Sequence, residues 1–133
     1  MSLTQTDIAW AAGLFDGEGS ISAHFIGPRL VLRLALSMTS KRAVDRFYEI
    51  IHEGTIHQRI TPKGRRLYCW SASFQDGAAV LNTIQGDLTV KAQQAVIYHT
   101  LASEMRGKRG PRLTKEITQW RKRLVRELQN LNL

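Results

Sequence analysis

The segment RLVLRLALSM, from Arg29 to Met38, alternates strictly between two kinds of side chain. Its leucines occupy every second position and lie on one face of an extended strand, whereas Arg29, Arg33 and Ser37 lie on the other face. A strand with one apolar and one polar face is typical of a sheet that is covered on one side only. The chain must therefore place helices against the leucines and leave the face with the arginines open.

Helices and hairpins alternate along the rest of the chain. Tight turns at Gly27-Pro28 and Pro62-Lys63-Gly64 each join two strand-like segments. The expected elements are a helix over 6–16, strands over 20–26 and 29–38, a helix over 40–54, strands over 55–61 and 65–74, and helices over 76–84, 91–105 and 115–131. Asp76 is the expected cap of the third helix, and Tyr68 and Trp70 are expected in the core. This order predicts an α+β domain with an antiparallel sheet.

Length and charge restrict the class of protein. A chain of 133 residues suits one domain, in which we expect a core over 1–105 and a basic linker with a C-terminal helix over 106–133 packed on it. Lys and Arg number 19 against 11 Asp and Glu, which gives a net charge of +8 and favours nucleic acid as partner, ahead of an anionic membrane surface. The sequence has no apolar run of about 20 residues, no segment typical of a signal peptide and no second cysteine that could pair with Cys69. We therefore expect an intracellular location, in the cytoplasm or nucleoid or in an organelle.

Two carboxylates, Asp16 and Glu18, lie two residues apart where the first helix gives way to a glycine-rich turn, in WAAGLFDGEGSI over residues 10–21. A calcium loop of the EF-hand type is excluded, because Ile21 and Gly27 occupy the sixth and twelfth positions, which require glycine and glutamate. Two solvated turn residues beside flexible glycines remain the simpler interpretation of this pair.

The helix before these acids favours a more specific interpretation. Ala9, Ala12 and Gly13 lie at i, i+3 and i+4, so that one stripe of the helix carries only small side chains. A second copy packed on this stripe across a two-fold axis would bring both acidic turns together. Converging carboxylates suit a divalent cation that activates water against a phosphodiester. We therefore expect a homodimer with Ala9, Ala12, Gly13 and Asp16 at its interface.

The segment AAGLFDGEGSI, residues 11–21, resembles the LAGLIDADG motif of the homing endonucleases. The agreement covers Ala12, Gly13, Leu14, Asp16, Gly19, Ser20 and Ile21, with Phe15, Gly17 and Glu18 in place of Ile, Ala and the second Asp. The expected element order is also similar to the αββαββα core of that family. The resemblance implies an antiparallel, saddle-shaped sheet covered by helices. Because the chain contains a single motif, it also implies a homodimer.

The resemblance further implies a site-specific endonuclease that hydrolyses double-stranded DNA at a long pseudo-palindromic target with Mg²⁺ or Mn²⁺. It implies no membrane partner and no small-molecule cofactor. Glu18 matches the metal-binding acid, and the backbone carbonyl of Gly17 can also face the metal. Lys91 matches a lysine near the attacking water or the scissile phosphate, where a solvated lysine at a helix start is the alternative. Ser40 stands where the family usually has a solvent-ordering glutamine, and Val44 where it has a basic residue.

Polar side chains of both hairpins are expected on the face opposite the leucines. A two-stranded ribbon fits the major groove, and these side chains offer the donors and acceptors that base edges require. The expected contacts are Ser22, His24, Arg29, Arg33 and Ser37 on the first hairpin and His57, Arg59, Lys63, Arg65 and Arg66 on the second. Candidates for contacts with flanking phosphates are the linker RGKRGPR over 106–112 and, on the last helix, Arg121, Lys122, Arg123 and Arg126. A solvated helix face is an equally open interpretation of these cations.

Two other function classes stay open at this point. The departures at Ser40 and Val44 are compatible with a catalytically weak or inactive DNA- or RNA-binding protein of the same fold, either an intron maturase or a transcription factor. The amphipathic C-terminal helix is compatible with an interaction protein that recruits a partner. A zinc site at His52 and His57 is disfavoured, because neither histidine has a cysteine or carboxylate at a useful spacing.

Overall fold

A helix followed by a β-hairpin occurs twice in succession, and three further helices complete the fold. The structure, a computed structural model, describes residues 3–105 and 114–133, so the linker over 106–112 lies outside the described residues. The elements are α1 (Gln5–Glu18), β1 (Gly19–Ile26), β2 (Arg29–Met38), α2 (Lys41–Ile51), β3 (Thr55–Ile60), β4 (Arg66–Ser73), α3 (Phe74–Ile84), the 3₁₀ turn η1 (Gln85–Asp87), α4 (Ala92–Glu104) and α5 (Lys115–Leu131). The expected α+β class and element order are confirmed.

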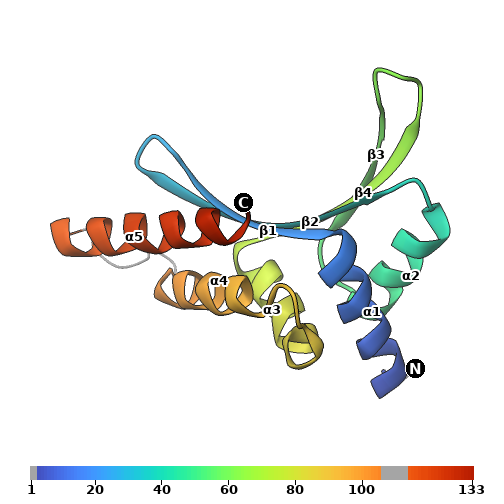
Figure 1. Ribbon diagram of the computed structural model, residues 1–133, viewed down its shortest axis with the longest axis horizontal. Coiled ribbons are helices and arrows are strands. Elements are labelled where there is room, and N and C mark those ends of the chain that lie inside the picture. Colours follow the sequence, from blue (N-terminus) through green and yellow to red (C-terminus); the bar gives the residue numbers. More distant parts are fainter. Residues whose placement is uncertain (1–2, 106–113) are drawn as a thin grey trace.

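The four strands form one antiparallel sheet in the order β1-β2-β4-β3. The two hairpins meet through β2 and β4, whose register runs from Arg33 opposite Ser73 to Met38 opposite Tyr68. Figure 1 shows the sheet curving so that the hairpins diverge, with the helices below it and an open concave face above. The saddle shape places the polar sides of both hairpins around one concave surface.

The leucine face of β2 forms the centre of the core. Leu30, Leu32, Leu34 and Leu36 are each at most 2% exposed. Each contributes about 1.5–3 kcal/mol relative to full exposure. The ring of Trp70 packs edge-on against that of Phe47, with 4.8 Å between centroids, and its Nε1 donates to the carbonyl of Glu53 at 2.8 Å. All five α-helices supply further apolar side chains beneath the sheet.

The last helix packs on the same core. Val125 and Leu128 of α5 are buried in the cluster that includes the leucines of β2. Arg121 is also buried and donates two hydrogen bonds of 2.9 Å to the carboxylate of Glu104 on α4. In the described parts of the chain, no helix has both the length and the apolar character that a membrane span requires.

Several element boundaries differ from the expected ones. Helix α2 ends at Ile51, before the expected end at residue 54, because His52 adopts the left-handed conformation. Gly17 continues the first helix, which ends at Glu18 because Gly19 turns away and donates its backbone N–H to the carbonyl of Phe15. The expected cap at Asp76 is wrong, because α3 already begins at Phe74. The carbonyl of Phe74 accepts a hydrogen bond of 2.8 Å from Tyr98 Oη on α4, which ties the first turn of α3 to α4.

Candidate catalytic site and nucleic-acid interface

The first acid of the motif, Asp16, is bound within its own chain. Its carboxylate accepts hydrogen bonds from the backbone N–H groups of Thr89 at 2.7 Å and Lys91 at 3.0 Å. In return, Lys91 Nζ donates to the backbone carbonyl of Asp16 at 2.7 Å. These three bonds tie the end of α1 to the loop before α4. The carboxylate of Asp16 thus satisfies backbone donors of its own protomer, and the place of Asp16 at an interface with a second copy stays a prediction.

Glu18, the second acid, differs from Asp16 in its surroundings. It is the last residue of α1, is exposed, and makes no hydrogen bond or ion pair with the residues described over 3–105 and 114–133. Its carboxylate is therefore available to a ligand. Gly17 lies in the last turn, where backbone carbonyls lack helical partners and the helix dipole is negative, so that a cation is favoured there.

The donor set at this helix end fits Mg²⁺ only in part within one protomer. Carboxylate and carbonyl oxygens are the ligands that Mg²⁺ prefers, and it commonly takes one or two carboxylates together with waters and substrate phosphate. Within the ranges 3–105 and 114–133, no group of three or more His, Cys, Asp or Glu side chains could hold a metal ion. Among the described residues, one protomer offers the carboxylate of Glu18 and the carbonyl of Gly17 at this helix end.

Lys91 and Ser40 are placed differently. Lys91 is half-buried, and its bond to the carbonyl of Asp16 holds its ammonium group at the same end of α1 as Glu18. Ser40 caps α2, because its Oγ accepts a hydrogen bond from the backbone N–H of Ala43 at 3.2 Å. Val44 lies fully buried in the core. The Ser40 hydroxyl thus has a structural role in addition to any role in solvent ordering.

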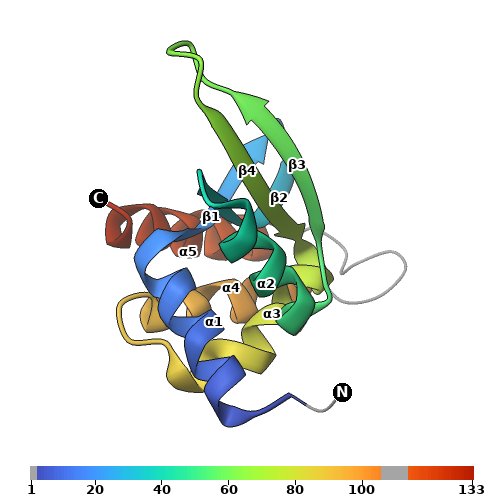
Figure 2. The ribbon, with the colours of Figure 1, turned by 90° about the vertical axis from the view of Figure 1, so that its right-hand side faces the viewer.

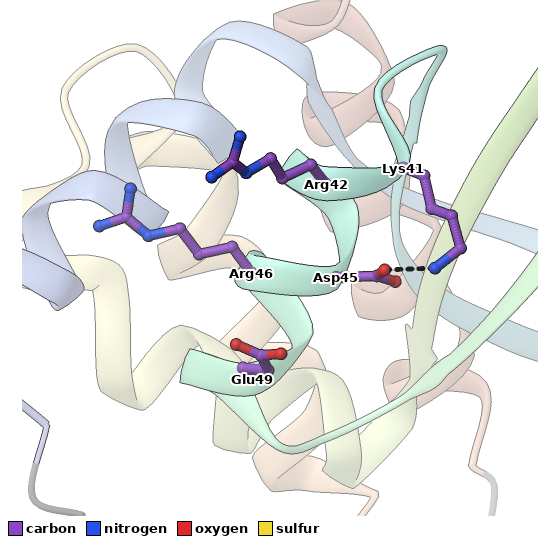
Figure 3. A pocket seen from close by; sticks show the side chains of 5 residues that line it. All are labelled: Lys41, Arg42, Asp45, Arg46 and Glu49. Carbon is purple, nitrogen blue, oxygen red and sulfur yellow. Dashed lines mark hydrogen bonds and ion pairs between the residues drawn. The ribbon is translucent and has the colours of Figure 1, made fainter.

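Charged side chains on the exposed side of α2 surround a shallow hollow of about 570 Å³ next to α1. Figure 3 shows Arg42 and Arg46 directed toward α1, and the guanidinium of Arg46 lies 4.1 Å from the centre of the Trp10 ring. Lys41 donates to Asp45 at 2.6 Å, and this hydrogen bond raises the pKa of the lysine. Because Asp45 and Glu49 also line the hollow, it holds charges of both signs beside α1.

The exposed stripe of α1 differs from the expected one. Ala12 is fully buried in the core of its own protomer, so its assignment to a dimer interface is wrong. The helix period turns Ala9, Gly13 and Gly17 outward instead, at i, i+4 and i+8. A Cβ atom built at Gly13 or Gly17 meets nothing within 4 Å. Packing within the protomer therefore does not require these glycines, and the stripe leaves room for another backbone.

Strand register places most of the expected DNA contacts on the concave face. Ser22 lies opposite Arg33, and Cys69 lies between Ser37 and His57. A hollow of about 390 Å³ on this face is lined by Ser20, Ser22, Arg33, Ala35, Ser37, His57, Arg59, Cys69 and Trp70. His24 and Arg29 follow on the same face of the first hairpin by alternation. The structure thus brings five of the ten expected contacts to one hollow.

Arg66 does not lie on this face. It pairs with Ile60 and alternates with Tyr68 and Trp70, which point toward the helices, and its Nη1 donates to Gln58 Oε1 at 3.0 Å. The assignment of Arg66 to the DNA-reading face is therefore wrong. Lys63 and Arg65 are exposed at the tip of the second hairpin.

Sequence reasoning also missed polar residues on the concave face. Ser71 and Ser73 of β4 and Thr55 of β3 share that face, as their register with Ala35 and Arg33 shows. The alternation of β4 could have identified the two serines, since they alternate with the apolar Trp70 and Ala72.

The cations of the last helix are divided between two environments. Arg121 is buried against Glu104, so its assignment to flanking phosphates is wrong. The side chains of Lys122, Arg123 and Arg126 are exposed and free of this pairing.

Comparisons with known proteins agree on the fold. No protein-family model and no curated protein matches the sequence. Among solved structures, the homing endonuclease I-CvuI with a DNA target is similar at 18% identity, over 96% of this chain and 82% of that chain, with a TM-score of 0.80. The archaeal intron-encoded homing endonuclease I-Vdi141I complexed with DNA matches at 17% identity over 95% and 84%, with a TM-score of 0.79.

A longer protein shows the same likeness over half its length. The LAGLIDADG meganuclease I-AabMI, bound to uncleaved DNA, matches at 17% identity over 89% of this chain and 43% of that chain, with a TM-score of 0.73. The motif at residues 11–21, the element order and these structural likenesses coincide. This chain has the fold of the LAGLIDADG homing endonucleases.

Proposed function

We propose that this protein is a metal-dependent endonuclease that cleaves double-stranded DNA at a long pseudo-palindromic target as a homodimer. The observation that carries this proposal is the exposed carboxylate of Glu18, which makes no bond within the described residues although it follows a helix end that is bonded into its protomer. A carboxylate that is only solvated would not require the exposed stripe of Ala9, Gly13 and Gly17 on α1. A metal site shared by two copies would require it, because their α1 helices have to approach closely.

The concave face supports binding of DNA. Arg33, Arg59 and His57 are gathered there with serine hydroxyls, and guanidinium groups can bond bidentately to guanine in the major groove. A net charge of +8 favours association with a polyanion. I-CvuI and I-Vdi141I, which share the fold, are DNA complexes. We therefore assign the concave face to base reading and the exposed cations at the hairpin tips to phosphate contacts.

Two features support the proposed homodimer: the single motif in the chain and the surface of α1. Ala9, Gly13 and Gly17 leave an open stripe, and two such stripes allow two helices to pack backbone against backbone. This chain corresponds to 82% of I-CvuI but to only 43% of I-AabMI, which is consistent with one half of a two-fold arrangement. Each half would contribute one Glu18 to the centre.

The residues at the helix end suggest how hydrolysis proceeds. Glu18 and the carbonyl of Gly17 would hold Mg²⁺ or Mn²⁺, which supplies Lewis acidity and lowers the pKa of a bound water. Lys91, positioned by Asp16, adds positive charge that stabilises the developing charge on the scissile phosphate. Ser40 can still donate its hydroxyl proton to an ordered solvent molecule, because its Oγ acts as acceptor in the cap.

The decisive experiment separates binding from cleavage. Sites bound by the parent protein are selected from a randomised duplex library in Ca²⁺, and the recovered pool is transferred to Mg²⁺ and sequenced at its ends. We expect discrete cuts, with short 3′ overhangs, at the centre of a two-fold site. Glu18→Gln should retain binding and lose cleavage by at least about 100-fold, more than the usual cost of altering a residue that only orients a metal ligand.

The matched control is Glu127→Gln on α5, an exposed glutamate far from the motif in sequence. Both substitutions should change the free energy of unfolding by less than about 0.5 kcal/mol, because both side chains are exposed. Full activity of Glu18→Gln would overturn the assignment of Glu18, and a site that stays intact in Mg²⁺ and Mn²⁺ would overturn the nuclease.

The dimer is tested with Gly13→Leu. The new side chain has space in the protomer, where a Cβ meets nothing within 4 Å, but it would stand between two packed α1 helices. We expect sedimentation velocity to show monomers at concentrations where the parent is dimeric. Gly86→Leu is the control, because a Cβ at Gly86 also meets nothing within 4 Å and the residue lies outside α1. A dimer that is unaffected by Gly13→Leu contradicts the proposed interface.

A second candidate function is binding without cleavage. Two observations favour it. Ser40 is engaged as the cap of α2, and the position of Val44, where the family has a basic residue, is apolar and buried. A DNA binder should lose affinity as salt rises, with a log-log slope near −0.9 per neutralised phosphate. Specific binding with no product in either metal would favour a transcription factor, and tighter binding of RNA than of duplex DNA would favour a maturase.

A further inference from the structure

The outer edge of β1 is covered by α5. Because the sheet order is β1-β2-β4-β3, β1 has a strand neighbour on one side only. On its other side, Asn132 Nδ2 donates to the carbonyl of Ile21 at 2.8 Å, and Gln129 Nε2 donates to the carbonyl of Ala23 at 3.2 Å. We propose that Gln129 and Asn132 are positioning residues that set the place of the β1 surface that reads DNA.

The two bonded carbonyls belong to residues that alternate with the concave-face residues. Ile21 and Ala23 point their side chains into the core, so Ser20, Ser22 and His24 point to the concave face. Two anchor points separated by one residue hold both the position and the twist of this short stretch of backbone. A side chain that contacts a base edge moves with that backbone, because β1 has no second strand neighbour on its outer side within the described residues.

Helix α5 is also held by contacts with elements other than β1. Arg121 on α5 is bonded twice to Glu104 on α4 at 2.9 Å, and Val125 and Leu128 are buried in the core. Figure 1 shows α5 running along the underside of the first hairpin, with the C-terminus close to the start of β1. The amides of Gln129 and Asn132 are therefore presented from a helix that is anchored elsewhere.

The effect should be confined to one part of the target. Bonds between side chains and base edges lose strength when either partner moves, and a good bidentate contact discriminates by about 1–3 kcal/mol, or roughly 5- to 150-fold. The outer strand at the other end of the sheet, β3, is exposed at every position and receives no bond from α5 among the described residues. Loss of the two amide donors should thus affect base pairs read by β1 and leave those read by β3 and β4 unchanged.

The test compares Asn132→Asp with Asn130→Asp in the full chain. Both substitutions add one negative charge to the end of α5, but only Asn132 donates to β1, whereas the Asn130 side chain is exposed and makes no bond with the described residues. Affinity is measured for the selected target and for each of its single-base-pair variants. The inference rests on the proposed DNA binding, so the carbonyl ¹³C shifts of Ile21 and Ala23 in the free protein are measured as well.

We expect Asn132→Asp to shift the Ile21 carbonyl resonance and to reduce discrimination about tenfold at the base pairs nearest β1. Asn130→Asp should weaken binding equally for all variants. A uniform loss with Asn132→Asp, or an unchanged Ile21 resonance, would overturn the positioning role. If the parent selects no DNA site, the proposed function and the DNA-reading part of this inference both fail, while the carbonyl shifts still decide whether the helix holds the strand.

Discussion

The two hairpins of the sheet have the same topology but different supports. The first, β1–β2, lies on helices with its leucine face buried and its outer edge bonded to α5. The second, β3–β4, projects away from the helices toward its tip, as Figure 2 shows, and all six residues of β3 are exposed. Burial of one face therefore holds the first hairpin, whereas the strand ladder and the anchor at Trp70 hold the second.

This difference explains which side chains could be assigned to the concave face from the sequence. In the first hairpin, an error of one residue in register would expose the leucines, so the polar face follows from the apolar pattern. In the outer half of the second hairpin neither face is buried. Arg66 points to the same face as the buried Trp70, because the two lie an even number of positions apart along β4. The concave surface is thus formed by a first hairpin with one buried face and a second hairpin whose outer strand is exposed.

Stability gives the largest contrast between the hairpins. Leu34→Ala should lower the free energy of unfolding by about 2–5 kcal/mol, because Leu34 is fully buried and its loss leaves a cavity. Ile60→Ala should change it by less than about 0.5 kcal/mol, because Ile60 is 64% exposed near the tip of the second hairpin. Urea unfolding of both variants measures the difference. Equal losses would show that the second hairpin is packed as tightly as the first.

Base reading gives a smaller contrast. Arg33→Ala removes a guanidinium from the concave hollow and should reduce discrimination at one base pair by about 1–3 kcal/mol. Arg66→Ala removes a side chain that points to the helix side and bonds to Gln58, so it should weaken binding to all sequences alike. Affinities for single-base-pair variants distinguish these outcomes. A base-specific loss with Arg66→Ala would place that residue on the reading face after all.

The sequence predicted the parts of this fold that depend on local pattern. Alternation in β2 identified the buried face, and the small residues with two acids at 11–21 indicated where the first helix gives way to a strand, although α1 continues to Glu18 rather than ending at Asp16. The fate of each acid was not predictable in the same way. The carboxylate of Asp16 accepts hydrogen bonds from the backbone of Thr89 and Lys91, more than 70 residues away in sequence. The residues near Asp16 in the sequence do not indicate these partners.

The other errors have the same physical origin. Ala12 and Gly13 look alike as small residues, and only the position of the core beneath α1 decides which of them is buried. In the sequence Arg121 resembles the other cations of the last helix, but in the structure it is bonded to Glu104 on α4. Tertiary partners, rather than propensity, separate the exposed cations from the buried one.

The smallest expected effect concerns pH and the support beneath the first hairpin. Helix α4 contacts β1 and α5, and partial burial of His99 on α4 lowers the pKa of its imidazole from the ordinary value of about 6.5. Between the lowered and the ordinary pKa, the unfolded chain binds more protons than the folded chain, so stability falls as the pH drops. We expect a modest loss of unfolding free energy between pH 7.5 and 5.5, and His99→Gln should reduce its pH dependence. Hydrogen exchange should place this loss in α4 and β1, while β3 exchanges as before once the intrinsic effect of pH is removed. A loss of protection confined to β3, or a free energy of unfolding that rises on acidification, would contradict the difference in support between the two hairpins.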